Sequence, residues 1–192
     1  TKYNFIASEF VDTLVELHKL NIEEIGLDKF GRPEGYCSRQ VQGWSKRYKN
    51  SRTSDIPEIN FVIKWLNKNI SESEYVSLIH NDFKYDNLIL DSKNLSVKSV
   101  LDWEMCTIGD PFMDLGTSLA YWINKDEGCA FFAIDEIYFV FGLFKIAVIV
   151  QQIYFRYERG FTNDIRFKNL NLVVQSYARM AKISIENQKI EF

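Results

Sequence analysis

The sequence has few cysteines and no concentration of basic residues. Its three cysteines, Cys37, Cys106 and Cys129, are an odd number and form no C-x-x-C pair. This usage argues against a disulfide framework or a zinc site and indicates reduced thiols that only contribute to packing, as in a cytoplasmic protein. The net charge is -3, and no Lys/Arg-rich stripe is present. These features argue against binding to nucleic acid or to an anionic membrane surface.

Long hydrophobic runs are also missing. The longest apolar stretch, Ile137 to Val150, is interrupted by Gly142 and Lys145. It is too short to span a bilayer and predicts a buried helix, and no cleavable signal peptide opens the sequence. With 192 residues, 46% of them hydrophobic and 15% aromatic, the chain has enough apolar material for one core. We therefore expect a single domain over residues 1–192 and no membrane segment.

Hydrophobic spacing predicts that most of the chain is helical. Helices are expected at residues 4–20, 36–48, from Pro57 onward, 110–123, 134–159 and 167–187. The third helix should bury Phe61, Val62, Trp65 and Leu66. The fourth should begin at Asp110-Pro111, where an acid at the N-cap precedes proline at the first helical position.

Three short apolar runs predict strands. They cover residues 75–79, 88–90 and 97–101. The residues Asp91 to Asn94 are typical of a turn, so the last two strands should form a hairpin. The predicted fold class is mainly α with a small β-hairpin (α+β).

Next to this hairpin lies the most informative pattern of the sequence. Residues His80 to Asn87 read H-N-D-F-K-Y-D-N, and Asp102 follows the apolar pair Val100-Leu101. The pattern H-x-D-x-x-x-x-N, followed by a hydrophobic strand that ends in Asp, is typical of the catalytic loop and metal-binding acid of protein-kinase-like phosphotransferases. The pattern therefore predicts an ATP-dependent phosphotransferase.

Each residue of the pattern suits one part of this chemistry. Asp82 is placed to accept the proton of the acceptor hydroxyl, and Asn87 and Asp102 offer the hard oxygen ligands that Mg²⁺ prefers. Lys84 would reach the γ-phosphate of ATP. His80 is expected to anchor the loop by hydrogen bonding.

For three further residues the sequence predicts less specific roles. Asp114 lies in the first turn of the helix that Asp110 caps, where it would face the catalytic loop and support it structurally. Glu104 would either supplement the metal site or be solvated. His18, late in the first helix, is expected to be a surface or helix-end residue rather than a ligand.

Two other functions remain open at this stage. Acids and amides at strand ends are often ordinary turn residues, which would leave a kinase-like module that binds a metabolite or partner without turnover. The presence of Asp82, Asn87 and Asp102 together favours the enzyme over this module. A metal-dependent hydrolase with His80 and Asp82 as ligands is the weaker alternative, because His18 is the only other histidine and lies in a separate helix.

From about Phe5 to Met180, the chain resembles the C-terminal lobe of the aminoglycoside phosphotransferase and choline kinase-like family. The segments that carry the resemblance are His80–Asn87, Leu101–Glu104 and Gly109–Gly116. The stretch Phe30–Tyr36, with Arg39, Gln40 and Trp44 after it, is similar to the subgroup found fused to acyl-CoA dehydrogenases.

The resemblance implies that Asp82 is the catalytic aspartate, that Asn87 and Asp102 bind magnesium and that ATP is the donor. No glycine-rich loop and no strand lysine paired with a helix glutamate precede the pattern, so we expect the N-terminal lobe to be missing and the isolated chain to bind Mg-ATP weakly. The family places the acceptor between the catalytic loop and the C-terminal helices, which are rich in aromatic residues here. A small hydroxylated metabolite such as a hydroxylated acyl compound fits these helices better than an aminoglycoside, which would need a concentrated acidic cleft.

Overall fold

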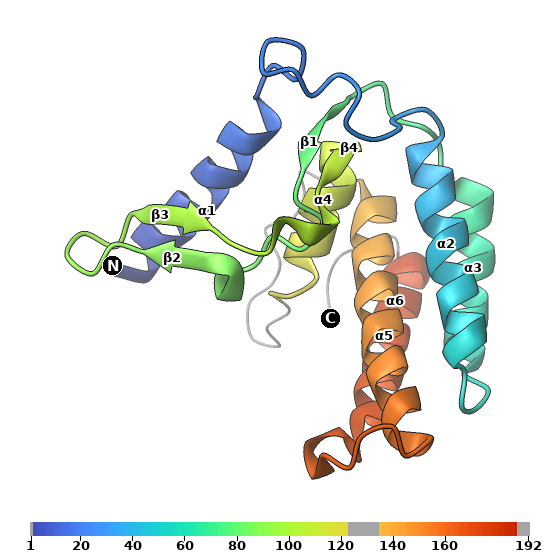
Figure 1. Ribbon diagram of the computed structural model, residues 1–192. Helices are drawn as coiled ribbons and strands as arrows, with labels where there is room; N and C mark the ends of the chain where they lie inside the picture. The colour runs from blue at the N-terminus through green and yellow to red at the C-terminus, as the bar shows by residue number, and fades with distance from the viewer. Residues whose placement is uncertain (1, 123–134, 188–192) are drawn as a thin grey trace.

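The computed structural model describes residues 2–122 and 135–187 and shows a mainly helical fold with two small antiparallel sheets (Figure 1). This confirms the predicted fold class. The α-helices are α1 (Lys2–His18), α2 (Tyr36–Ser51), α3 (Pro57–Asn69), α4 (Pro111–Leu119), α5 (Glu136–Glu158) and α6 (Leu170–Asn187). The strands are β1 (Ser77–Ile79), β2 (Leu88–Leu90), β3 (Val97–Val100) and β4 (Thr107–Gly109), and short 3₁₀ turns are η1 (Tyr85–Asn87), η2 (Trp103–Met105) and η3 (Ile165–Phe167).

Helix α5 is the centre of the main core. It packs against α2, α3, α4 and α6, and a helix that is apolar on nearly all sides is typical of such a buried position. By length and composition α5 could also cross a membrane, but 61% of its most apolar window is buried inside the protein. Its hydrophobicity is therefore accounted for by packing.

Helices α4 and α5 approach each other closely enough for their backbones to touch. A Cβ atom added to Gly142 would lie 2.2 Å from the carbonyl oxygen of Gly116, and one added to Gly116 would lie 2.3 Å from the carbonyl oxygen of Tyr138. Glycine at both positions thus sets the distance between the two helices. This contact matters for the site, because α4 carries Asp114.

The face that α3 presents to the core differs from the predicted one. Val62 and Leu66 are buried as expected and Trp65 is partly buried, but Phe61 is 38% exposed and Ile59 takes its place in the core. Residues 59, 62 and 66 follow the i, i+3, i+7 spacing of a single helical stripe. The prediction for Phe61 was wrong because its aromatic side chain was given more weight than this spacing.

The predicted hairpin is present as β2 and β3, in which Leu88 pairs with Val100. The first predicted strand is shorter than expected: it covers Ser77–Ile79, and Tyr75 is exposed. It pairs with β4, a strand that the sequence analysis did not predict. Unlike Leu88–Leu90, the residues Thr107–Gly109 form no continuous apolar run, so no local pattern marks this strand.

Helix α1 lies on the other side of the site from the main core (Figure 1). Its residues Phe10 and Leu14 pack with Phe83 of the catalytic loop, and Leu88 and Val100 of the hairpin lie against this cluster. The catalytic loop is therefore held between α1 and the hairpin on one side and the α4–α5 pair on the other.

The remaining expectations for helices and cysteines are confirmed in part. The side chain of Asp110 caps α4 by accepting from the N–H of Phe112 at 2.8 Å, and α4 ends at Leu119; residues 123 and 134 lie outside the described part of the chain. Cys37 is buried, and its thiol donates to Asp110 at 3.2 Å. Burial raises the pKa of Cys37 to about 12, so this thiol stays protonated as expected, but it adds a hydrogen bond to its packing role. Cys129 lies outside the described residues.

Candidate active site

The carboxylate of Asp82 is the meeting point of three side chains. Lys84 Nζ lies 2.5 Å from its Oδ2 atom, Asn87 Nδ2 donates to the same oxygen at 3.1 Å, and Tyr121 Oη donates to Oδ1 at 3.0 Å. Asp82 itself is only partly buried. It is therefore fixed in orientation by its neighbours while remaining reachable from solvent, as a general base must be.

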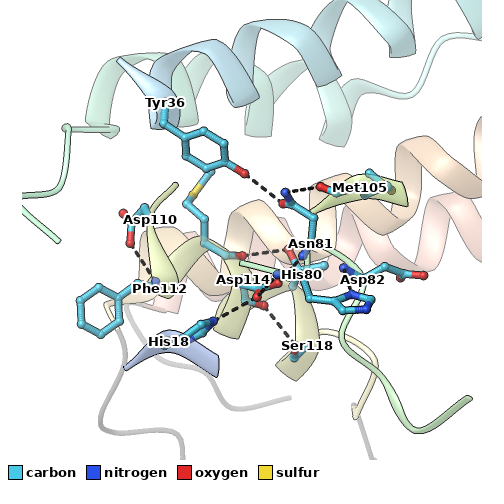
Figure 2. Close-up of polar contacts among 12 residues, drawn as sticks. His18, Tyr36, His80, Asn81, Asp82, Met105, Asp110, Phe112, Asp114 and Ser118 are labelled. Carbon is cyan, nitrogen blue, oxygen red and sulfur yellow. Dashed lines mark hydrogen bonds and ion pairs between the residues drawn. The ribbon is translucent and has the colours of Figure 1, made fainter. Parts of the chain in front are cut away.

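The loop that carries Asp82 is held from beneath by Asp114, which is fully buried (Figure 2). The Oδ2 atom of Asp114 accepts from the backbone N–H of His80 at 2.8 Å, and Oδ1 accepts from that of Asn81 at 2.7 Å. Burying a carboxylate is costly unless hydrogen-bond donors surround it. These two bonds join Asp114 of α4 to the backbone of the catalytic loop, which is the contact that a supporting role predicts.

His18 is the third donor to this carboxylate. Its Nε2 atom lies 3.1 Å from Asp114 Oδ2, and its side chain is 15% exposed. The expectation of a helix-end residue is confirmed, since His18 is the last residue of α1, but the alternative of a surface residue was wrong. Its partner lies 96 residues away along the chain, and a helical pattern does not reveal such a contact.

Asn81 adopts the left-handed backbone conformation, with φ at 68°, which asparagine tolerates better than most residues. Its side chain is held at both ends: Oδ1 accepts from the hydroxyl of Tyr36 at 3.0 Å, and Nδ2 donates to the carbonyl of Met105 at 3.0 Å. Burial raises the pKa of Tyr36, so its hydroxyl stays protonated and remains a donor. Asn81 thereby joins the catalytic loop to α2 and to η2.

His80 uses both ring nitrogens to shape the loop. Nε2 donates to the carbonyl of Leu101 at 2.8 Å, while Nδ1 accepts from the backbone N–H of Asp82 at 3.2 Å. This arrangement requires the neutral tautomer with the proton on Nε2. These are the bonds that the expected anchoring role of His80 predicts, and a histidine with both nitrogens engaged does not suit the metal-dependent hydrolase alternative.

The two expected magnesium ligands lie at the same end of the β2–β3 hairpin. The backbone N–H of Leu101 donates to the carbonyl of Asn87 at 2.8 Å, which places Asp102 beside Asn87. Both hydrogens of Asn87 Nδ2 go to Asp82, so Oδ1 is the atom left for a cation. The Asp102 side chain is exposed, and its backbone adopts the left-handed conformation, with φ at 64°. One carboxylate and one amide oxygen fit a cation whose other ligands are phosphate oxygens and water.

Other acids do not extend this pair. Glu104 is exposed in η2, which favours the solvated alternative. Within residues 2–122 and 135–187, no three His, Cys, Asp or Glu side chains are grouped so that they could hold a metal ion. A metal at this site would depend on the nucleotide for much of its coordination.

Sequence analysis missed two residues of the site, Tyr121 and Lys145. Lys145 lies in α5, is 1% exposed, and donates to the backbone carbonyl of Asn81 at 2.6 Å. Burial lowers its pKa to about 8, although the carboxylates of Asp114 and Asp82 act in the opposite direction. The available signal for Lys145 is a single lysine within an apolar run, which can indicate a buried charge with a polar partner as well as an interruption of the run.

With this geometry established, comparison with known proteins identifies the family. The model of the phosphotransferase enzyme family matches residues 6–140 of the sequence. The chain belongs to the phosphotransferase enzyme family. The match includes the catalytic loop, the hairpin, Asp102 and Asp114, which are the elements that build the site.

Curated relatives place this chain near the subgroup suggested by the sequence. The chain is 30% identical to acyl-CoA dehydrogenase family member 10 of Mus musculus over 88% of its length, and 35% identical to acyl-CoA dehydrogenase family member 11 of Rattus norvegicus over 78%. It spans only 19% and 23% of these two relatives. The resemblance to the subgroup fused to acyl-CoA dehydrogenases is thus confirmed.

A solved structure shares the fold. It comes from Ralstonia eutropha and carries the provisional name aminoglycoside phosphotransferase. The TM-score is 0.84 at 26% identity, and the match covers 95% of this chain and 65% of the other. The kinase-like fold expected from the catalytic loop is therefore confirmed, and the solved protein is longer than the part that the two chains share.

Proposed function

We propose that this phosphotransferase is the catalytic and acceptor-binding part of a small-molecule O-kinase that uses ATP. The observation that carries the proposal is the convergence of Asp82, Asn87 and Asp102 at one end of the hairpin. Asn87 bonds to Asp82 through its amide and lies beside Asp102 through the Leu101 backbone. A protein that only bound a metabolite would have no need to place a base beside two cation ligands.

In the proposed reaction, Asp82 accepts the proton of an acceptor hydroxyl. The hydroxyl oxygen forms a bond to the γ-phosphorus of ATP while the bond from that phosphorus to the β–γ bridging oxygen breaks, and ADP leaves. Lys84, already 2.5 Å from Asp82, would place its positive charge next to the transferred phosphoryl group. Tyr121 keeps the base oriented by donating to the oxygen that Lys84 does not contact.

The residues present fit the magnesium that this chemistry requires. Asn87 through Oδ1 and Asp102 through its carboxylate would hold the ion, which when bound neutralises phosphate charge. Asn87 would offer Oδ1 to the ion, because Asp82 takes both of its amide hydrogens. The hydrogen bond from His80 Nε2 to the carbonyl of Leu101 fixes the backbone just before Asp102.

We propose a small hydroxylated metabolite as the acceptor, with hydroxylated acyl compounds as the first class to test. The support for this class is that the curated relatives are named as acyl-CoA dehydrogenases. A kinase domain and a dehydrogenase in one polypeptide suit consecutive steps on one acyl substrate. Aminoglycosides are the alternative class, because they appear in the name of the solved structure.

The test is ADP release by the full-length protein with hydroxyacyl-CoAs, choline and aminoglycosides in turn. We expect release with a hydroxylated acyl compound and its loss by at least about 10³-fold in Asp82→Asn, because removing the base removes proton transfer and orientation together. Asp86→Asn, an exposed acid of η1, is the matched control and should retain activity. Full activity in Asp82→Asn would disprove the assigned base, and ligand binding without ADP release from any acceptor would support the non-catalytic module.

A further inference from the structure

A basic groove lies beside the catalytic loop, and the reaction described above does not use it. Its volume is about 290 Å³, at the lower end of the range for small-molecule sites. The lining residues are Arg32, Tyr36, Arg39, Gln40, Trp44, Arg47, Asn81, Met105 and Thr107. Three of these nine described residues are arginines and none is an acid, although the whole chain has a net charge of -3. The groove is therefore a local concentration of positive charge on an acidic protein.

Two of the arginines are held in place by the protein. The guanidinium group of Arg39 donates to the backbone carbonyls of Arg32 and Glu34, which fixes the loop that carries Arg32. The guanidinium carbon of Arg47 lies 4.6 Å from the centre of the Trp44 ring. Arginine groups held in this way lose little conformational entropy when they bind a ligand.

A further positive charge lies near Trp44, one of the residues that line the groove. The ammonium group of Lys145 lies 5.6 Å from the centre of the same Trp44 ring. Lys145 is buried and hydrogen-bonded to Asn81, so it does not contact a ligand directly. Its charge still favours an anion above Trp44, because charge interactions weaken slowly with distance in a protein interior.

The groove reaches the catalytic residues through Asn81. Figure 2 shows the Asn81 side chain between Tyr36 and Met105, which both line the groove. The next residue along the chain is Asp82, so the groove ends one position before the base, although Asp82 itself is not among the residues that line it.

We propose that this groove binds an anionic group of the acceptor, either a carboxylate or a phosphate, while a hydroxyl of the same molecule faces Asp82. The inference rests on the proposed kinase function and specifies its substrate class. Guanidinium groups bind both kinds of anion through paired N–H donors. The inference also gives a role to the Phe30–Tyr36 segment and to Arg39, Gln40 and Trp44, which build one wall of the groove. A polycation such as an aminoglycoside would be repelled there.

The test measures binding without turnover, by two-dimensional NMR titration of the 192-residue chain. The probes are D-glycerate for a carboxylate, glycerol 3-phosphate for a phosphate, glycerol for the hydroxyl groups alone and kanamycin for a polycation. We expect at least one anion to bind and to shift signals of the groove residues, and glycerol and kanamycin to leave them unchanged. The stronger of the two anions identifies which group the acceptor carries. Binding of neither anion, or binding of kanamycin in the groove, would overturn the inference.

Variants locate the binding. Arg32→Ala and Arg47→Ala, both at exposed positions, should each weaken anion binding at least about fivefold, since each removes a charge-assisted hydrogen bond. Lys46→Ala removes the same charge from an exposed neighbour of Arg47 outside the groove and should change the affinity less than twofold. Equal losses in all three variants would indicate a general charge effect and contradict the groove.

Different results would disprove the kinase function and the anion-binding groove. If full-length protein releases ADP in a manner that requires Asp82 while anion affinity is unchanged in Arg32→Ala and Arg47→Ala, the kinase stands and the groove assignment is wrong. If those variants lose anion binding but no acceptor supports ADP release, the anion site stands without the kinase. Arg39 is left intact in both experiments because it holds the Arg32 loop.

Discussion

The helical core and the catalytic loop are stabilised in opposite ways. Around α5, the core residues are almost all apolar, and Phe139, Val140, Leu143 and Ala147 are completely buried. The loop from His80 to Asp82 is held by hydrogen bonds to Asp114, Leu101, Tyr36 and Met105, and the His80 ring also contacts Phe83 and Trp103. The core distributes its stabilisation over many side chains, whereas the loop concentrates it on a few polar atoms, so one substitution should affect the loop far more specifically.

Two of the contacts near the boundary between these regions can be used to test this difference. The backbones of α4 and α5 touch at Gly116 and Gly142, and Lys145 of α5 donates to the loop at Asn81. A change at the first point should damage the whole fold. A change at the second should alter the loop and its dependence on pH.

The largest effect is expected for Gly142→Ala. The new Cβ atom would lie 2.2 Å from the carbonyl oxygen of Gly116, and backbone cannot move aside as a side chain can. We expect a loss of at least about 3 kcal/mol in the free energy of unfolding, measured by urea denaturation followed by circular dichroism. Gly43→Ala is the matched control: it lies in α2, where only the end of the Arg47 side chain is near. Equal stability of the two variants would show that the α4–α5 contact is not tight.

Lys145→Met tests the link between core and loop through pH. The pKa of Lys145 is about 8 in the folded chain and 10.5 as its ordinary value. The unfolded chain therefore binds more protons between these two pH values, and this lysine makes wild-type stability rise with pH across that window. Relative to Lys145→Met, the wild type should gain up to about 3 kcal/mol between pH 8 and 10.5. The readout is the difference between their unfolding free energies at several pH values.

Taking the difference in unfolding free energy between the two proteins cancels the contributions of tyrosines and cysteines that titrate in the same pH range. Lys46→Met, at an exposed position of α2, is the control, and its difference from the wild type should stay constant with pH. A constant difference for Lys145→Met as well would mean that Lys145 keeps its ordinary pKa in the folded chain.

Asp114→Asn should damage the loop more than the core. Asp114 uses both carboxylate oxygens to accept from His80 and Asn81, and an asparagine offers only one acceptor. The unsatisfied N–H group should cost about 2 kcal/mol of stability, and hydrogen exchange of the amides at positions 80 and 81 should increase more than exchange in α5. Asp86→Asn removes a charge from the same loop without these bonds. Uniformly faster exchange throughout the protein would contradict a local role for Asp114.

Tyr121→Phe should have the smallest effect. Burial and the neighbouring Asp82 carboxylate raise the pKa of Tyr121, so the phenol is protonated and donates to Asp82. Removing this one partly buried hydrogen bond should cost about 1 kcal/mol in unfolding free energy. Tyr177→Phe, at another partly buried tyrosine, serves as the control. A larger loss for Tyr177 would show that ring packing, and not the bond to Asp82, determines the cost.

Local patterns in the sequence were sufficient for the helices, the hairpin and the residues of the catalytic loop. Helical periodicity, the Asp110-Pro111 start signal and the spacing from His80 to Asn87 each depend on neighbours within a few residues, and such patterns can be recognised without the fold. The face of α3 shows the limit of this approach, since Ile59 rather than Phe61 enters the core. Strand β4 shows it as well, because Thr107–Gly109 has no continuous apolar run and becomes a strand only by pairing with β1.

The sequence by itself determined the family, because Asp82, Asn87 and Asp102 stand at diagnostic spacings on a strand, loop and hairpin. Only the tertiary structure decided which residues support that chemistry. His18 reaches Asp114 across 96 positions, Lys145 reaches Asn81 across 64, and Tyr121 reaches Asp82 across 39. Contacts over such separations arise from how helices pack around a common core, and the hydrophobic pattern of a single segment carries no information about its distant partners.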